Sequence, residues 1–162
     1  MKALMVAVAL LALGGGKKTE TKIAPDPNEK AAKAHGGRVW VQGDQIPSES
    51  GDALMQWLGS HPATQTIAQK TKDGPWAIQY VAVFKKPAAK GPMTVQFVEK
   101  SDPKNVVDQY SPNNDAPALV FQSSFDLDPD RGFNKGHTYL IKVGQLIKKS
   151  FVVYATGEVT LK

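Results

Sequence analysis

An alternating run of aspartates is the densest cluster of potential metal ligands in the sequence. Asp126, Asp128 and Asp130 are separated by single residues, and Gly132 follows at the same spacing. Carboxylate oxygens at alternating positions can converge on Ca²⁺, a hard cation that takes roughly six to eight oxygen ligands. The spacing therefore indicates one candidate calcium site.

A structural turn is the competing interpretation of these aspartates. Arg131 stands where a helix-loop-helix calcium loop needs a glycine, and His137 stands where that loop needs its closing glutamate. Pro129 and the flanking strand pattern favour a turn in which each carboxylate accepts hydrogen bonds from neighbouring amides. The residues alone leave both interpretations open.

The histidines form no motif for metal binding or catalysis. His35, His61 and His137 are far apart in the sequence, and no two have the spacing of helical metal ligands. The chain has no cysteine, which excludes disulfides, thiolate metal sites and cysteine nucleophiles. We therefore expect a non-enzymatic protein. A hydrolase of envelope polymers is the less favoured alternative, and it needs His61 or His137 beside a carboxylate or hydroxyl in a cleft.

Exposed aromatic rings would support recognition of a glycan or a protein, because flat rings bury a large area at low entropic cost. The residues considered for such a platform are Trp40, Trp57, Trp76, Tyr110 and Tyr154. The competing interpretation places Trp57 and Trp76 in the core. A carbohydrate-binding module is therefore the alternative function. Nucleic acid is not expected as a partner, since no basic stripe is interleaved with aromatics, despite a net charge of +5.

Alternating apolar residues predict a series of β-strands from Arg38 onward. The predicted strands are 38–42, 76–85, 93–99, 106–110, 118–125, 137–143 and 151–161. One short helix is expected after Ser50 or Asp52, with Leu54, Trp57 and Leu58 on one face. No long helix lies between strands to cross over a parallel sheet, so the pattern favours an antiparallel sandwich.

The stretch Gly136-His137-Thr138-Tyr139 resembles the approach to the penultimate strand of immunoglobulin-like and fibronectin type III-like domains. The resemblance covers roughly residues 118–161. It implies a mainly β fold, an immunoglobulin-like antiparallel β-sandwich of about seven strands with one short inserted helix. It also implies that Tyr139 is a structural residue whose hydroxyl bonds to backbone in the preceding corner. Such a fold hosts many functions and selects none of them.

Residues 1–16 resemble a bacterial lipoprotein-type export signal, with a basic start and an apolar run too short to span a bilayer. Leu13-Gly14-Gly15 resembles a lipobox, which would place the lipid-modified cysteine at Gly16. Glycine has no thiol to acylate. The segment is thus either a variant lipoprotein precursor or an ordinary secretory signal. Both imply export, to the periplasm, to an outer-membrane anchor or to the cell surface.

Residues 17–37 are rich in Lys, Glu, Ala, Pro and Gly and contain no aromatic residue, which predicts a flexible tether. The predicted organisation is a signal peptide (1–16), a tether (17–37) and a β-sandwich domain (38–162). The expected function is binding or structural association in the cell envelope. Expected partners are the membrane, through the lipid anchor of the natural form, and another envelope protein or a glycan. Assembly through an edge strand, 38–42 or 106–110, is a further hypothesis.

Overall fold

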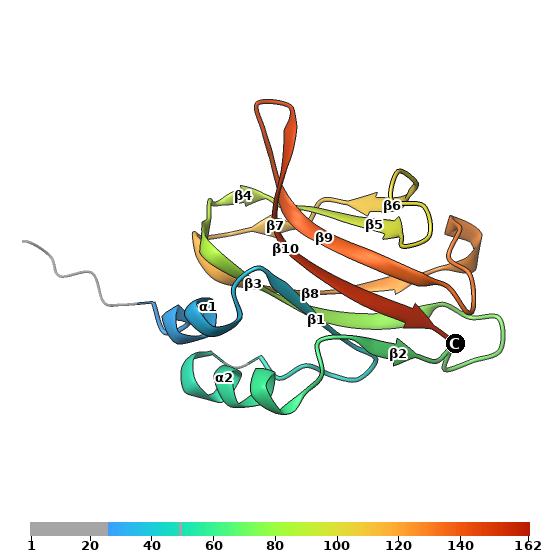
Figure 1. Cartoon of the computed structure of the whole chain (residues 1–162), viewed down its shortest axis with the longest axis horizontal. Helices are drawn as coiled ribbons and strands as arrows, with labels where there is room; N and C mark the ends of the chain where they lie inside the picture. The colour runs from blue at the N-terminus through green and yellow to red at the C-terminus, as the bar shows by residue number, and fades with distance from the viewer. Residues whose placement is uncertain (1–25, 49) are drawn as a thin grey trace, which may run out of the picture.

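The computed structural model describes residues 26–48 and 50–162, and within them the chain is mainly β (Figure 1). The elements are α1 Glu29–His35, β1 Arg38–Gln42, α2 Gly51–Ser60, β2 Gln65–Ile67, β3 Trp76–Ala88, β4 Gly91–Pro92, β5 Thr94–Glu99, β6 Val106–Tyr110, β7 Asn113–Asn114, β8 Ala118–Leu127, the 3-10 helix η1 Pro129–Arg131, β9 Thr138–Ile147 and β10 Ser150–Leu161. The predicted mainly β class and its seven strands are confirmed. The export signal and Gly16 lie outside the described residues.

One curled sheet contains the seven predicted strands, in the order β6-β5-β9-β10-β1-β3-β8, with β2 added beside β10. Neighbours on this path are antiparallel except β1 and β10, which are parallel and meet at Arg38 and Thr156. The sequence predicted an antiparallel sandwich, whereas the structure has this one curled sheet and a separate two-stranded sheet of β4 and β7. The pairing of the first strand, β1, with the last strand, β10, joins the two halves of the curled sheet.

The main core lies inside the curl of the sheet. Its largest fully buried side chains include Trp76, Tyr80, Phe84, Phe97, Phe133 and Tyr139. The edge strands β6 and β8 face each other across stacked rings, with Tyr110 and Phe125 4.3 Å apart between centroids. The Arg131 guanidinium lies over the Phe125 ring and also donates to Asp108 on β6, 2.7 Å away. These contacts hold the two edges together without strand pairing.

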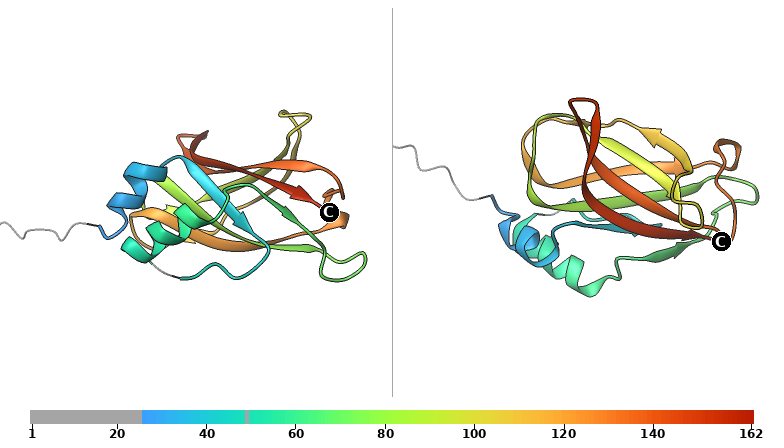
Figure 2. Two further views of the ribbon diagram at one scale, coloured as in Figure 1. Left: turned by 60° about the horizontal axis from the view of Figure 1, so that its bottom comes forward. Right: turned by 45° about the horizontal axis from the view of Figure 1, so that its top comes forward.

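Two helices cover the outer face of β1 and β3 (Figure 2). Trp40, Val81 and Val83 point outward from these strands, because alternate residues of a strand face opposite sides of the sheet. Leu54 of α2 and Ala31 of α1 pack on them and complete a second core cluster. The strand β3, which lies inside the sheet between β1 and the edge strand β8, is therefore apolar on both faces, as its sequence predicts. No helix in the described part of the chain is long and apolar enough to cross a bilayer.

The helix α1 corrects two predictions made from the sequence. The chain has two α-helices in its described part, where one was expected. The predicted tether, 17–37, is wrong for its second half, because Ala31 in α1 is fully buried and packs with Trp40. Its first part, 17–25, lies outside the described residues. Composition did not reveal this helix because the segment has few large apolar residues, whereas alanines on a strongly helix-forming segment suffice to dock it.

Candidate functional site

The three aspartates of the candidate calcium site do not converge on one point. Asp128 caps the 3-10 helix, and its Oδ1 accepts the amide of Asp130 at 2.9 Å. Asp126 lies on β8, paired in register with Ala77 on β3. Within residues 26–48 and 50–162, no group of three or more acidic or histidine side chains is placed to hold a metal ion. The geometry is that of a capped turn.

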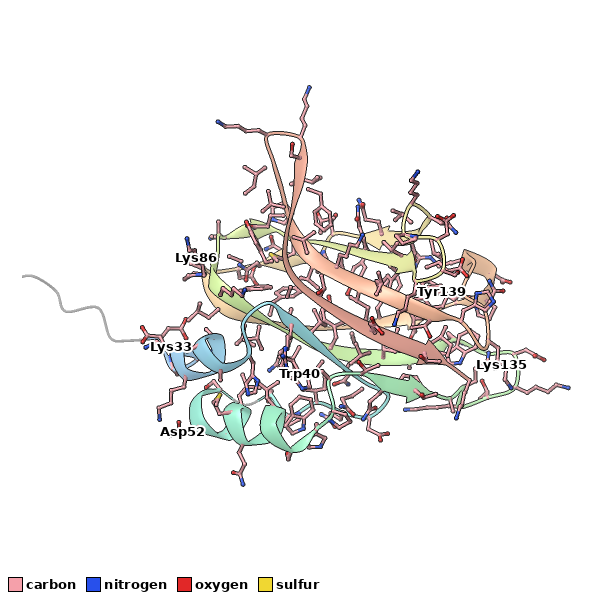
Figure 3. All side chains as sticks on the ribbon, viewed as in Figure 1. Lys33, Trp40, Asp52, Lys86, Lys135 and Tyr139 are labelled. Atoms are coloured by element: carbon pink, nitrogen blue, oxygen red, sulfur yellow. The ribbon has the colours of Figure 1, made fainter. Side chains whose placement is uncertain are left out.

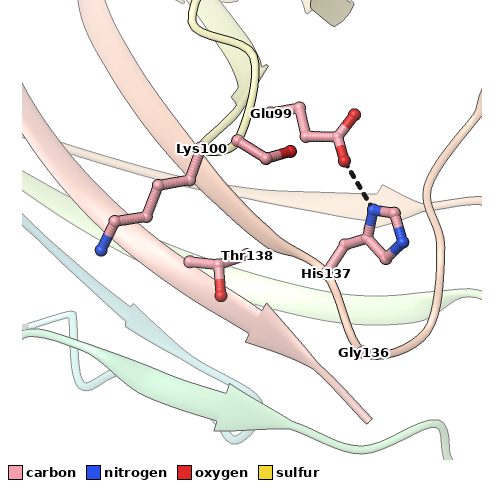
Figure 4. A pocket seen from close by; sticks show the side chains of 6 residues that line it. Glu99, Lys100, Gly136, His137 and Thr138 are labelled. Carbon is pink, nitrogen blue, oxygen red and sulfur yellow. Dashed lines mark hydrogen bonds and ion pairs between the residues drawn. The ribbon is translucent and has the colours of Figure 1, made fainter.

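The structure does place His137 beside a carboxylate. Its Nδ1 lies 2.6 Å from Oε1 of Glu99, which ends β5 next to the start of β9 (Figure 4). The hydrogen bond from His137 is the largest influence on Glu99, and it lowers the pKa of that carboxyl below its usual value. The pair lines an open surface depression of about 440 Å³.

Two other polar side chains of this depression form structural pairs with the last strand, β10. Lys100 donates to Glu158 at 2.7 Å, and Thr138 shares a 2.8 Å hydrogen bond with Thr160. These pairs link β5 and β9 to the last strand. Ser101 also lines the depression, and its hydroxyl is a second hydrogen-bond partner that lowers the pKa of Glu99. The depression thus gathers one histidine and one hydroxyl around a single carboxylate, and within the described residues His137 bonds to Glu99 and not to Ser101.

The other two histidines have structural contacts. His61 stacks on Trp57 with ring centroids 4.5 Å apart, and its Nδ1 lies 2.8 Å from the Trp57 carbonyl oxygen. His35 packs edge-on against the buried Trp40 ring. Neither histidine is brought beside a carboxylate, and the hydroxyl beside His61, Ser60 Oγ at 3.0 Å from its Nδ1, is exposed on the end of α2.

The aromatic residues considered for a binding platform do not form an exposed row. Trp40 and Trp76 are each 2% exposed, and their indole nitrogens donate to the carbonyls of His61 and Lys162. Tyr154 is half-buried, packing edge-on against Phe84. The carbohydrate-binding alternative therefore loses the surface on which it was based.

Tyr139 lies in the corner that the sequence resemblance assigned to it. Its side chain is fully buried, and its hydroxyl accepts the backbone N–H of Asn134, five residues earlier, at 2.7 Å. Burial raises the pKa of Tyr139, so its hydroxyl stays neutral. Figure 3 shows the residue inside the body of the molecule. The contact fixes the approach to β9.

A projecting hairpin is the most unusual surface of the molecule. The strands β9 and β10 continue past the rest of the sheet and stand out from the body (Figure 1). The projecting segment, 144–153, is called the tip hairpin below. Four of the five large hydrophobic residues exposed in the described chain lie on it: Leu146 at 59%, Ile147 at 46%, Val152 at 38% and Val153 at 41%.

The tip hairpin is apolar on both faces. Register pairs Leu146 with Phe151, so these two residues share one face, whereas Ile147 and Val152 lie on the other. An antiparallel hairpin that stands in water normally alternates apolar and polar residues. A hairpin with apolar residues on both sides therefore indicates a contact surface.

The turn of the tip hairpin places two lysines in an unfavourable backbone conformation. Lys148 and Lys149 have φ values of 49° and 69°, the left-handed region that such turns usually fill with Asn and Gly. Each lysine there costs on the order of 1 kcal/mol. Lysines at these strained positions of an apolar hairpin indicate that their positive charge serves a function, since Asn or Gly would fit the turn with less strain.

Sequence reasoning missed this hairpin. It predicted that one strand ends at Val143 and the next begins at Phe151, with a loop between them. The available signal was the symmetric arrangement of Leu146-Ile147 and Phe151 about two lysines. It was weak, since a Lys-Lys pair is not a hairpin turn signal.

Comparison with known proteins gives no family for this chain: no family model, curated protein or solved structure matches it.

Proposed function

We propose that this protein is a non-enzymatic domain of the bacterial cell envelope, acting in binding or structural association, and that the tip hairpin is its contact surface. The observation that carries the proposal is the set of exposed aliphatic side chains on both faces of a projecting hairpin. Exposed apolar residues that gather on one element commonly mark an interaction site. Export rests on the lipoprotein-type signal in residues 1–16, and localisation in the periplasm or at the outer membrane is part of the proposal.

The fold is proposed to be a variant of the immunoglobulin-like sandwich. Its support is the Gly136-His137-Thr138-Tyr139 stretch and the hydrogen bond between Tyr139 and the preceding corner. In this description the curl of the sheet brings its two halves face to face around the core, as two packed sheets would be.

Photo-crosslinking in cells tests the contact surface. A photoreactive amino acid is placed at position 146 of the full chain, which is expressed with its own leader. Matched positions are 71, exposed at the other end of the molecule, and 106, an exposed apolar residue on the edge strand β6. We expect light-dependent adducts at position 146 and none at position 71.

Two results would contradict this assignment. Adducts at position 106 alone would transfer the contact to β6 and support edge-strand assembly. The other edge candidate, 38–42, is already wrong, because β1 lies between β10 and β3 in the sheet. Absence of adducts at all three positions would remove the basis for a binding domain.

One observation favours the alternative of a hydrolase, namely the Glu99 and His137 pair at the surface depression. Purified peptidoglycan sacculi provide a direct test of it. Wild type and His137→Ala are incubated with the sacculi, and soluble fragments are measured. We expect no release by either protein. Release by wild type that is lost in His137→Ala would establish catalysis.

A further inference from the structure

The tip hairpin carries cations at both of its ends. Lys148 and Lys149 form its turn, and the exposed Lys86 and Lys90 lie in the segment that adjoins its base. That segment is tied to the hairpin, because Gln145 donates from Nε2 to the Ala89 carbonyl at 3.0 Å.

Acidic residues are scarce around the hairpin. Residues 144–153 contain no Asp or Glu, and in the adjoining segments 86–92 and 113–115 only Asp115 is acidic. Asp115 also accepts a hydrogen bond from Asn113. The electrostatic potential along the hairpin is therefore positive from base to tip.

The outer face of the hairpin is its larger apolar face. Gln145 points from the opposite face to the body, where it contacts Ala89, so the face of Leu146, Phe151 and Val153 is directed away. Its middle residue, Phe151, lies against Gly144, which has no side chain to separate them. The outer face is thus an apolar strip that leads to the turn lysines, Lys148 and Lys149, whereas Lys86 and Lys90 lie in the segment that Gln145 contacts from the other face.

We propose that this outer face binds an anionic lipid bilayer, with the hairpin lying along the membrane surface. This inference rests on the proposed function, because it names the partner of the same hairpin. The turn lysines lie at the level of the phosphates, and the apolar strip beside them enters the boundary with the acyl chains, about 5 to 10 Å deep. Lys86 and Lys90 add longer-range attraction to the anionic surface. An upright hairpin is disfavoured, since its turn lysines would then be the most deeply buried groups.

A second copy of the chain fits the hairpin less well. It would bring the same lysines and the same net charge of +5. Four aliphatic side chains exposed by between 38% and 59% also cannot supply the roughly 800 Å² per partner of a standard protein interface. Binding to a bilayer does not require so large a buried area, because the free energy of apolar burial and the attraction to anionic headgroups add to each other.

A fluorescent probe on the hairpin tests this contact in the full chain. The sequence has no cysteine, so Leu146→Cys gives a unique position for an environment-sensitive fluorophore. The control is Thr71→Cys, which lies among Lys70, Lys72, Lys135 and Lys162 and so combines positive charge with no aliphatic strip. Vesicles of phosphatidylcholine alone are compared with vesicles that contain phosphatidylglycerol. Because the fluorophore senses only its own surroundings, it reports on contact of the hairpin with lipid even if the leader residues also bind the vesicle.

We expect a blue shift and a several-fold intensity increase at position 146 with the anionic vesicles only, together with quenching by spin-labelled lipid. The pair Lys148→Gln and Lys149→Gln is expected to weaken this response about thirtyfold in the midpoint lipid concentration. The same exchange at Lys70 and Lys72 is expected to leave it unchanged. Thermal melts of each variant establish that it is folded.

Two outcomes overturn the inference. The first is a probe at position 146 that does not respond while the chain is on the vesicles. The second is an equal response at position 71, which would show attraction of any basic surface. Protein adducts at position 146 in cells, together with a silent probe, would retain the proposed function and refute the lipid partner. If position 146 gives neither protein adducts in cells nor a probe response on vesicles, both the proposed function and the lipid partner are refuted.

Discussion

Gly157 lies where the last strand passes closest to the first, and its replacement by alanine tests the join between the two halves of the sheet. A Cβ atom at this position would be 2.5 Å from the Val39 carbonyl oxygen and 2.8 Å from the Val39 Cβ. Both are atoms of β1 that no side-chain rotation can move. To restore ordinary contact, β1 would have to retreat by roughly 0.9 Å.

The expected cost follows from that displacement. Overpacking of this kind destabilises by about 1 to 3 kcal/mol. The retreat also weakens the hydrogen bond from the Thr156 amide to the Gly37 carbonyl, 3.1 Å long, which contributes about 1 kcal/mol. We therefore expect Gly157→Ala to lower the free energy of unfolding by about 2 to 4 kcal/mol.

Urea unfolding measured by tryptophan fluorescence is a suitable assay, since Trp40 and Trp76 are each 2% exposed. The urea midpoint should fall by about 1 to 2 M with an unchanged slope. Gly59→Ala is the matched control, because a Cβ there meets nothing within 4 Å. In α2 it should stabilise by about 0.5 to 1 kcal/mol. If Gly157→Ala is as stable as wild type, β1 and β10 do not approach each other in this way.

Three further changes test separate contacts. Ala31→Asp should lower the free energy of unfolding by about 2 to 3 kcal/mol, because it buries an unpaired carboxylate. Ala34→Asp, on the exposed side of α1, should change the free energy of unfolding little. Equal urea midpoints for these two variants would show that α1 is not docked. Tyr139→Phe should cost about 1 kcal/mol by leaving a backbone amide without its acceptor, and an unchanged thermal midpoint would refute that role. His137→Gln should raise the pKa of Glu99 toward its usual 4.5, followed by NMR titration. Since the pKa of Glu99 is lowered in the folded state, its contribution to stability is present above pH 4.5 and is lost as the pH falls through the lower folded value; an unshifted titration would show that the pair does not form.

The strands were predictable because local pattern dictates them. Val39 and Val41 alternate with the outward Trp40, and the predicted bounds of β1 and β6 agree with the structure to the residue. The sequence resemblance also located Tyr139 at the corner before β9, because a four-residue stretch suffices to recognise that turn.

Features that depend on distant partners were not predictable. Ala31 is a core residue only because Trp40 and Leu54 pack against it, and its small side chain gives no signal of burial in the sequence. Asp126, Asp128 and Asp130 have a spacing that permits metal binding, but Asp128 caps a 3-10 helix and the described residues hold no group of three ligands placed for a metal ion.

For this protein, the sequence alone determined the mainly β class, the seven strands of the main sheet, the absence of disulfides and the positive charge, because each depends on near neighbours or on composition. Only the tertiary structure decided which strand ends project beyond the sheet. Leu146, Ile147, Val152 and Val153 are of residue types that usually fill a core, yet they are exposed because β5 and β1 do not continue beside them. Exposure depends on which elements cover a segment, and that covering is set by contacts far apart in the chain.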